Sequence, residues 1–255
     1  MTITLAVANQ KGGVAKTTTV ASLGAALAEQ GNKVLLVDLD PQACLTFSLG
    51  IDPEDLELSV HHVLTKGLDA TGVVIETEDG VDLLPATIEL ARAEADLLTR
   101  TGREHVVRAA LEELDGYDWV LLDCPPSLGV MTVAALTAAD GVLIPLQCET
   151  LSHRGVGQLL DTVHDVRRFT NKSLEVWGVL PTLYDGRTNH ARAVLETISE
   201  TYELEVVEPP IPKSIRFAEA PAAGRSILAT SRTHRGADAY RAVATNLTGR
   251  AARRG

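Results

Sequence analysis

The sequence predicts an α/β fold: a mostly parallel, twisted sheet with helices on both faces. Continuous apolar runs recur along the chain, and segments with helical periodicity separate them. The chain has 255 residues, 45% of them hydrophobic, which is enough for one large core. Strands that helices cover on both sides are apolar throughout, so the pattern favours a buried parallel sheet that binds ligands beyond the carboxyl ends of its strands.

Six apolar runs and five periodic segments define the predicted elements. Strands are expected at 3–9, 33–40, 81–86, 118–126, 141–147 and 175–183. Helices are expected over 16–30, 87–114, 129–139, 151–170 and 188–203. Residues 48–80 are the least regular and are expected to form an insertion or a cap over the strand ends. Because the sequence shows neither a repeat nor a long linker, residues 1–255 are expected to form a single domain.

Composition excludes several classes of protein. The sequence contains no uncharged apolar run long enough to span a membrane and no charged leader before a cleavable apolar segment, so a cytoplasmic protein is expected. Cys44, Cys124 and Cys148 lack the spacing of a zinc ribbon and the even count of a disulfide framework, which predicts buried thiols. Aromatic residues make up 4% of the chain, too few for a stacking platform that binds single-stranded nucleic acid.

Charge is divided unequally along the chain. The net charge is −11, but residues 1–150 carry −15 and residues 151–255 carry +4. The basic C-terminal segment, residues 212–255, has nine Lys and Arg against two acidic residues. Such a segment attracts a polyanion even on an acidic protein. The alternative is a solvated helix face followed by a basic tail.

A phosphate-binding loop is predicted directly after the first strand. That strand ends at Asn9 and continues into QKGGVAKTTT, which an Ala- and Leu-rich helix follows. Backbone N–H groups of such a loop and the positive end of the helix dipole bind anions. Lys16 adds a positive charge for the outer phosphates, and the Thr17 hydroxyl is a ligand for Mg²⁺.

Carboxylates end two further predicted strands. Asp38 and Asp40 in VDLDPQ lie two residues apart and therefore start on the same face of the chain. Asp123 ends the strand in WVLLDCPPS, where two prolines stop the chain. Beside a nucleotide, such carboxylates hold Mg²⁺ or position the attacking water.

These three segments resemble one family. The ordinary phosphate-loop pattern GxxxxGK[ST] is not met, because Gln10 and Ala15 occupy its glycine positions, but KGGxxK[ST] is met from Lys11 to Thr17. With VDLDPQ and DCPPS, the chain resembles the deviant Walker-A ATPases and specifically the ParA partition ATPases, relatives of MinD, nitrogenase iron protein and the arsenite-pump ATPase.

The resemblance implies ATP and Mg²⁺ as cofactors and slow, partner-stimulated hydrolysis in a dimer that forms with ATP. The lysine matching Lys11 reaches across that dimer to the partner's phosphates. Asp40 matches the catalytic carboxylate, while Asp38 supports the metal site that Thr17 and Asp123 form. The residues expected to bind nucleotide in the loop are Lys11, Gly12, Gly13, Val14, Ala15, Lys16, Thr17 and, at the α-phosphate, Thr18.

The chain departs from the family's pattern in two places. Most members have glycine at Ala15; alanine there costs about 1 kcal/mol if the position needs a positive φ, and nothing if the backbone is already helical. We expect the helical alternative. After VDLDPQ, Ala43 and Cys44 replace a Gly-Asn pair, which leaves the contacts of this segment open.

The C-terminal half carries two further resemblances. PTLYDGRTNH at 181–190 and IPKSIRFAEAP at 211–221 resemble segments of chromosomal, Soj-like ParA proteins. In the family these segments lie near the adenine, so Pro212 is expected to contact the base. Arg187, Lys213 and Arg216 are expected on a surface that binds double-stranded DNA without sequence specificity. Alternatively, Arg187 caps its turn or pairs with Asp185.

Together these features predict an ATPase that segregates a chromosome or plasmid. Its expected partners are a second copy of the chain, non-specific duplex DNA and a ParB-like centromere-binding protein, and its expected location is the nucleoid. One rival is a MinD-like ATPase that acts on a membrane or a protein scaffold. The C-terminal apolar stripe of Tyr240, Val243 and Leu247 favours packing on the core over membrane attachment. A second rival is a regulatory protein with little turnover.

Overall fold

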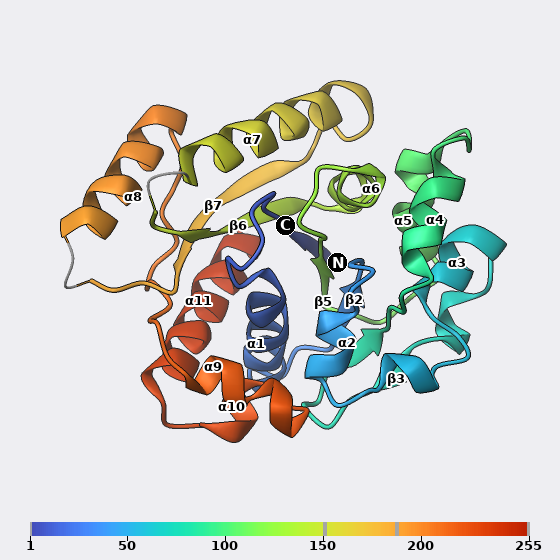
Figure 1. The fold of residues 1–255 in the computed structure, drawn as a ribbon, viewed down its shortest axis with the longest axis horizontal. Helices are drawn as coiled ribbons and strands as arrows, with labels where there is room; N and C mark the ends of the chain where they lie inside the picture. The colour runs from blue at the N-terminus through green and yellow to red at the C-terminus, as the bar shows by residue number, and fades with distance from the viewer. Residues whose placement is uncertain (1, 150–151, 187–188, 254–255) are drawn as a thin grey trace.

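One sheet organises the protein. The computed structural model describes residues 2–149, 152–186 and 189–253. Across these ranges, seven strands pair in the order β3-β4-β2-β5-β1-β6-β7, and all pairs are parallel except β3 with β4 (Figure 1). The strands are β1 Ile3–Val7, β2 Val34–Asp38, β3 Ile75–Glu76, β4 Asp82–Leu84, β5 Trp119–Asp123, β6 Gly141–Gln147 and β7 Glu175–Thr182.

Helices connect the strands. The longer ones are α1 Lys16–Glu29, α6 Val130–Ala138, α7 Ser152–Phe169, α8 Asn189–Tyr202 and α11 Arg235–Ala251. Shorter ones are α2 Cys44–Ser48, α3 Val60–Lys66, α4 Leu90–Leu97, α5 Val106–Leu111, α9 Arg216–Glu219 and α10 Ile227–Thr230. Four 3-10 helices complete the described chain: η1 Pro53–Asp55, η2 Ala70–Gly72, η3 Arg103–His105 and η4 Pro221–Ala223.

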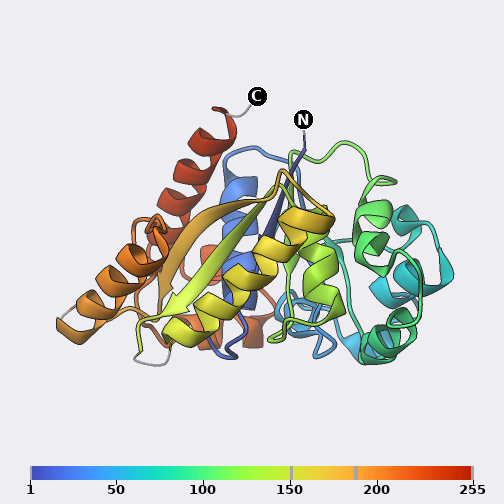
Figure 2. The ribbon, with the colours of Figure 1, turned by 90° about the horizontal axis from the view of Figure 1, so that it is seen from above.

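The strands are apolar because both faces of the sheet are buried. Successive residues of a strand point to opposite faces. Leu5 and Val7 of β1 join a hydrophobic cluster with α1 and α11, whereas Ala6 joins the opposite cluster with α4 to α8. Figure 1 shows α6 and α7 on one side of the sheet and α1 and α11 on the other, and Figure 2 shows α6 and α7 crossing in front of it.

The predicted α/β fold is confirmed, and each predicted strand agrees with an observed one to within three residues at either end. The continuous helix predicted over 87–114 is wrong. The chain turns between α4 and α5, where Gly102 has a φ of 72°. Residues 48–80 do more than cover strand ends, because they supply α3 and the antiparallel edge strand β3.

The C-terminal helix packs on the core, as the sequence predicts. Tyr240, Val243 and Leu247 of α11 are buried against α1. The Tyr240 hydroxyl lies 3.0 Å from that of Thr19 in α1, and its ring stacks edge-on against Phe217 of α9. Among the described helices, none combines the length and apolarity needed to cross a membrane.

A close backbone contact joins α2 to the C-terminal part. Gly50, just after α2, and Gly224 both have positive φ. A Cβ on Gly224 would lie 2.8 Å from the Cα of Gly50, which leaves no room for a side chain. The contact fixes α2 beside the segment that carries α9. Helix α2 follows the carboxylates Asp38 and Asp40 at the end of β2.

Candidate functional site

The loop between β1 and α1 is held by polar contacts from two neighbouring strands. The Asn9 amide donates to the carbonyl of Pro145 in β6 at 2.8 Å, and its Oδ1 accepts the Lys11 N–H at 3.0 Å. The hydroxyl of Thr182, the last residue of β7, donates to the carbonyl of Val14 at 2.9 Å. These contacts hold the loop in place before any ligand binds.

The centre of the loop is open for an anion. Gly12 and Gly13 are exposed, and a Cβ on either would meet nothing within 4 Å. Helix α1 starts at Lys16 and has no side chain capping its N-terminus. The first N–H groups of a helix lack partners within it, so they are free to bind phosphate.

Ala15 adopts the left-handed conformation, with φ 65° and ψ 35°. The expectation of a helical backbone at this position is therefore wrong. The Cβ of an L-residue approaches the following carbonyl in this conformation, which is why glycine suits it. Ala43, which also stands where the family has glycine, has a φ of 51°. The chain thus places alanine at two left-handed turns of the site.

Replacing Ala15 by glycine is expected to stabilise the nucleotide-free protein. Relief of the left-handed strain favours the folded state, and the greater freedom of glycine in the unfolded chain offsets part of it, so the net gain is up to about 1 kcal/mol. Urea unfolding measures it. The matched control is Ala95→Gly on the exposed side of α4. This variant is expected to have a free energy of unfolding about 0.5–1 kcal/mol lower than wild type. A destabilised Ala15→Gly protein contradicts strain at this position.

Lys16 points into the site. Its side chain is buried, and its Nζ donates to the carbonyl of Lys11 at 3.2 Å. Burial lowers the pKa of the Lys16 ammonium, and the carboxylates of Asp123 and Asp40 partly oppose that change. A buried ammonium with acidic neighbours is placed to bind phosphate oxygens.

Asp38 and Asp123 face each other at the ends of adjacent strands. They are register partners in the β2–β5 pair, and both are fully buried. Burial raises the pKa of Asp38 to about 6. Burial and then the charge of Asp38 raise the pKa of Asp123 well above its usual range. Two carboxylates so close together favour a cation between them.

Asp123 fits a Mg²⁺ ligand. Both of its carboxylate oxygens are buried without a hydrogen-bond partner within the described part of the chain, although the Thr17 side chain faces the group and partly offsets the rise in its pKa. No cluster of three or more His, Cys, Asp or Glu residues suited to a metal ion occurs among the described residues. Mg²⁺ bound with nucleotide takes one or two carboxylates plus phosphate oxygens and water, so Thr17 and Asp123 suffice.

Asp40 lies at the mouth of the site. It is half-buried, its Oδ1 accepts the Gln42 N–H at 2.9 Å, and its own N–H donates to Oδ1 of Asp38 at 3.2 Å. Its charge affects the pKa values of both Lys16 and Asp123. Asp40 is therefore close to Lys16 and Asp123, yet remains accessible to water.

Comparison with known proteins identifies the family. A family model described as an AAA domain matches residues 2–176. The sporulation initiation inhibitor protein Soj of Bacillus subtilis is 43% identical over 238 residues, which cover 92% of this chain and 94% of Soj. The chromosome-partitioning ATPase Soj of Thermus thermophilus is 44% identical over 96% of this chain and 95% of its own length. The chain belongs to the ParA family of partition ATPases.

A solved structure with bound nucleotide is similar to this ParA-family chain. Cobyrinic acid a,c-diamide synthase from Mycobacterium smegmatis with bound ADP and magnesium is 55% identical, with a TM-score of 0.88 over 97% of this chain and 94% of that one. The ParA-family chain is an ATP hydrolase, and ATP and Mg²⁺ are its cofactors.

Lys11, the family's additional lysine, pairs within its own chain. Its Nζ lies 2.5 Å from Oε2 of Glu149, which follows β6. Both side chains are partly exposed, at 33% and 53%. An exposed ion pair contributes little stability and opens easily, so Lys11 can exchange Glu149 for a phosphate.

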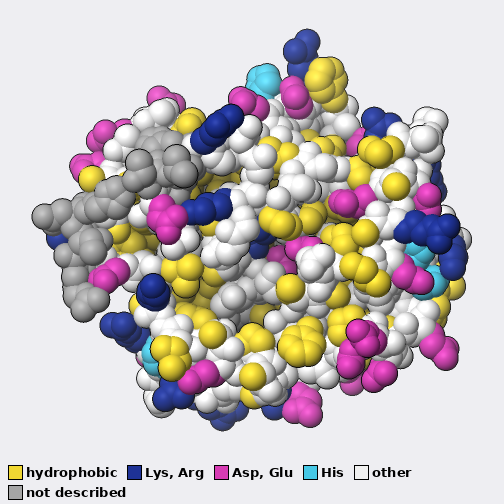
Figure 3. Space-filling model, viewed as in Figure 1, with side chains coloured by type: hydrophobic (Ala, Val, Ile, Leu, Met, Phe, Trp, Pro, Cys, Tyr) yellow, Lys and Arg dark blue, Asp and Glu magenta, His cyan; other side chains and the backbone are white. Residues whose placement is uncertain are grey.

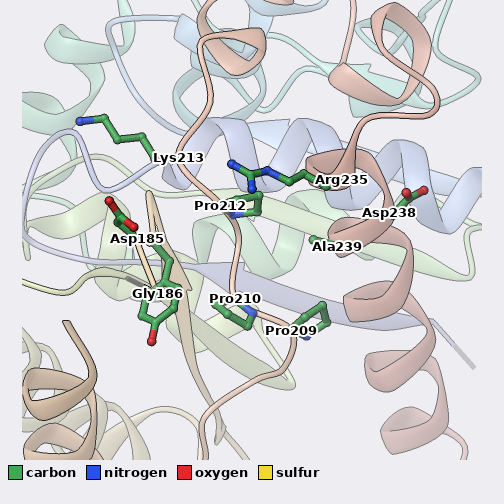
Figure 4. Close-up of a pocket in the computed structure, with 10 residues that line it drawn as sticks. Asp185, Gly186, Pro209, Pro210, Pro212, Lys213, Arg235, Asp238 and Ala239 are labelled. Carbon is green, nitrogen blue, oxygen red and sulfur yellow. The ribbon is translucent and has the colours of Figure 1, made fainter. Parts of the chain in front are cut away.

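Pro212 lies in a cavity beside the loop. The cavity has a volume of about 790 Å³ and is lined by Tyr184, Asp185, Gly186, Pro209, Pro210, Pro212, Lys213, Arg235, Asp238 and Ala239. Figure 4 shows the prolines between Asp185 and Gly186 on one side and the first turn of α11 on the other. Thr182 binds the loop through Val14, and Tyr184, two residues later, pairs with Pro212, so the end of β7 links the cavity to the loop.

The residues predicted to bind DNA are only partly described. Arg187 lies outside the described residues. Lys213 and Arg216 are exposed, and Arg216 pairs with Glu219 at 2.8 Å. Figure 3 shows Lys and Arg side chains gathered at the lower left, over α9 and the start of α11.

Sequence reasoning missed three supporting residues: Thr46, Glu149 and Thr182. Thr182 is a polar residue at the end of an apolar strand, and its side chain is buried. The same sequence pattern identified Asp38 and Asp123, so Thr182 could have been predicted in the same way. Glu149 meets Lys11 across 138 residues of sequence, and no local pattern indicates that contact.

Proposed function

We propose that residues 1–255 form one ATPase domain that works as a nucleotide-dependent DNA-partition switch. In this proposal the amides of Gly12 and Gly13 and the ammonium of Lys16 bind the outer phosphates, while Thr18 binds the α-phosphate. Thr17 and Asp123, with support from Asp38, hold Mg²⁺, which neutralises phosphate charge during hydrolysis. Asp40 orients the attacking water and accepts its proton.

ATP is proposed to join two copies of the chain. The open loop and the half-exposed Lys11 support this step, because a second nucleotide-bound copy would offer Lys11 a phosphate more highly charged than Glu149. In the dimer, Lys11 leaves Glu149 and contacts the partner's nucleotide, and hydrolysis reverses the exchange.

The observation that carries the DNA-binding proposal is the position of the exposed basic side chains. Lys213 lines the cavity beside Pro212, and Arg216 follows three residues later on the exposed first turn of α9, so two basic side chains lie on the surface near that cavity. Phe217 anchors α9 by stacking on Tyr240, which keeps Arg216 at the surface. Lys213, Arg216 and Arg187 are proposed to bind DNA phosphates without reading sequence.

The proposed partner is a ParB-like protein that binds the centromere and stimulates hydrolysis. The names of the Soj relatives as a sporulation inhibitor and a chromosome-partitioning ATPase support a role in segregation. Binding to DNA would place the protein on the nucleoid, and partner-stimulated hydrolysis would release it there.

Two rival functions have less support. A MinD-like membrane role needs an available amphipathic face, whereas the apolar residues of α11 are buried. Amide synthesis, which the name of the M. smegmatis relative denotes, uses a cysteine thiolate when the nitrogen comes from glutamine. Burial raises the pKa of the Cys124 and Cys148 thiols. Cys44 is exposed, so the expectation that all three thiols are buried is wrong, but partial desolvation and the neighbouring carboxylates Asp40 and Asp38 raise its pKa as well. None of these changes favours a thiolate.

The experiment that tests the proposal measures binding to random-sequence duplex DNA without nucleotide, with ADP and with ATP and Mg²⁺, at two salt concentrations. Light scattering follows dimerisation in parallel. Binding that requires ATP and weakens steeply with salt supports the proposal. ATP-dependent dimers that ignore DNA contradict the DNA role and favour a protein scaffold.

Arg216→Glu is expected to weaken ATP-dependent DNA binding by about tenfold or more and to lower its salt dependence, because each dimer loses two phosphate contacts. Fluorescence anisotropy of a labelled duplex measures both effects. Lys172→Glu makes the same charge change on an exposed residue before β7, at the opposite end of the strands, and is the control. Equal losses in the two variants would assign the effect to net charge and contradict a specific surface.

A further inference from the structure

Thr46 makes three buried hydrogen bonds beside the proposed metal site. Its N–H donates to Oδ2 of Asp38 at 2.9 Å, and its hydroxyl donates to the same oxygen at 2.8 Å. The hydroxyl also accepts the N–H of Ala86, just beyond β4, at 2.9 Å. Thr46 has no exposed surface. One side chain therefore connects the end of β2 to the chain after β4.

The path of the chain explains why Thr46 reaches back to Asp38. Ala43, with its left-handed φ of 51°, turns the chain into α2 and returns Thr46 to a residue eight positions earlier. At its other end, α2 is fixed by the contact between Gly50 and Gly224. Ala43 thus sets the start of the helix and Gly50 fixes the chain just after it, while Thr46, the middle residue of α2, touches the site.

A carboxylate as deeply buried as Asp38 needs hydrogen-bond donors to hold it in place. Asp38 is fully buried beside Asp123, and an unsupported buried carboxylate rotates or protonates. Within the described residues, the Asp38 side chain accepts three hydrogen bonds, and two of them come from Thr46 and end on Oδ2. Oδ1 accepts the Asp40 N–H at 3.2 Å and keeps one lone pair for a metal-bound water.

We propose that Thr46 is a positioning residue for the Mg²⁺ site, which fixes the Asp38 carboxylate through its hydroxyl and N–H while anchoring on Ala86. The inference rests on the metal-supporting role proposed above for Asp38. Hydrogen-bond partners behind a metal site orient the groups that face the ion, and their loss typically lowers metal affinity by about 10- to 100-fold.

The test measures Mg²⁺ binding apart from turnover. Mg²⁺ is titrated into the full chain in the presence of a fluorescent ADP, and the Mg²⁺ concentration at half-maximal signal is recorded. Thr46→Val keeps the shape and removes the hydroxyl, and it is expected to raise that concentration about tenfold. Thr46→Ser retains the hydroxyl and is expected to restore a value within about twofold of wild type.

A matched control separates positioning from general destabilisation. Thr137 of α6 is also fully buried, and its hydroxyl pairs with Thr170, away from the site. Thr137→Val is expected to lower the unfolding temperature but to leave the Mg²⁺ dependence unchanged. Thermal unfolding of all variants with saturating ADP shows that each one is folded during the titration.

Asp38→Asn and the double variant with Thr46→Val complete the test. If Thr46 acts through Asp38, the double variant binds Mg²⁺ as weakly as Asp38→Asn alone. Fully additive losses overturn the inference, as does a Thr46→Val protein with wild-type Mg²⁺ dependence while Asp38→Asn is impaired. In both cases the proposed role of Asp38 survives. Wild-type Mg²⁺ dependence of Asp38→Asn instead refutes that role and the inference with it.

Discussion

Asp123→Asn is expected to abolish Mg²⁺-dependent ATP hydrolysis and, in the same protein, to raise the stability of the nucleotide-free fold. The carboxylate is buried, without a hydrogen-bond partner within the described residues, and adjacent to Asp38. Asparagine has nearly the same shape and no charge, so it removes the repulsion and part of the cost of burial. A gain of about 1–3 kcal/mol is expected near pH 8. Hydrolysis assays and urea unfolding measure the two effects.

The gain in stability is expected to depend on pH. Because the folded-state pKa values of Asp123 and Asp38 lie above the unfolded value near 3.8, the folded wild type holds these protons more tightly than the unfolded chain. Ionisation of these two carboxylates therefore lowers the free energy of unfolding as pH rises from about 4 through their folded-state pKa values. For Asp38 that pKa is about 6. The difference between Asp123→Asn and wild type should be small at pH 5 and grow towards pH 8.

Asp96→Asn on the exposed surface of α4 is the control for charge alone, and its stability should differ little from wild type at either pH. Saturating ATP and Mg²⁺ should remove the advantage of Asp123→Asn, since bound ligand stabilises the wild type more. A variant that is less stable than wild type at pH 8 would show that Asp123 supports the fold itself.

The fold was largely predictable because its strands are buried on both faces. Six apolar runs gave six parallel strands, and β3, two residues long, left no periodic signal. The break between α4 and α5 escaped prediction because apolar residues recur at helical spacing on both sides of Gly102. A pattern of burial does not show whether the backbone between two helical segments is continuous.

The site was predictable where its residues end strands, and less so where contacts span the sequence. Lys16, Asp38 and Asp123 converge because parallel strands end at one edge of the sheet. The conformation of Ala15 was predicted wrongly, since alanine carries no sign of a left-handed φ. The bond from Ala86 to Thr46 crosses 40 residues and depends on two strands being neighbours, which only the sheet order reveals.

Asp40→Ala is expected to lower ATP hydrolysis by about 10²- to 10⁴-fold while nucleotide binding persists. Asp40 lies at the mouth of the site, half-buried, and its side chain accepts only the local N–H of Gln42 among the bonds described. Lys16, Thr17 and Asp123, the groups proposed to hold phosphate and metal, all remain. Single-turnover hydrolysis and binding of a fluorescent ATP analogue measure the two effects separately.

Persistence of the ATP-bound state is what makes this variant informative. If hydrolysis ends the proposed cycle, Asp40→Ala should accumulate as a dimer on DNA and fail to leave when ATP is withdrawn, whereas wild type leaves. Glu54→Ala, an exposed carboxylate in η1 shortly after the same segment, is the control and should behave as wild type. If Asp40→Ala loses ATP binding along with hydrolysis, Asp40 belongs instead to the groups that hold the metal, because the loss of a metal-binding group is expected to release the nucleotide.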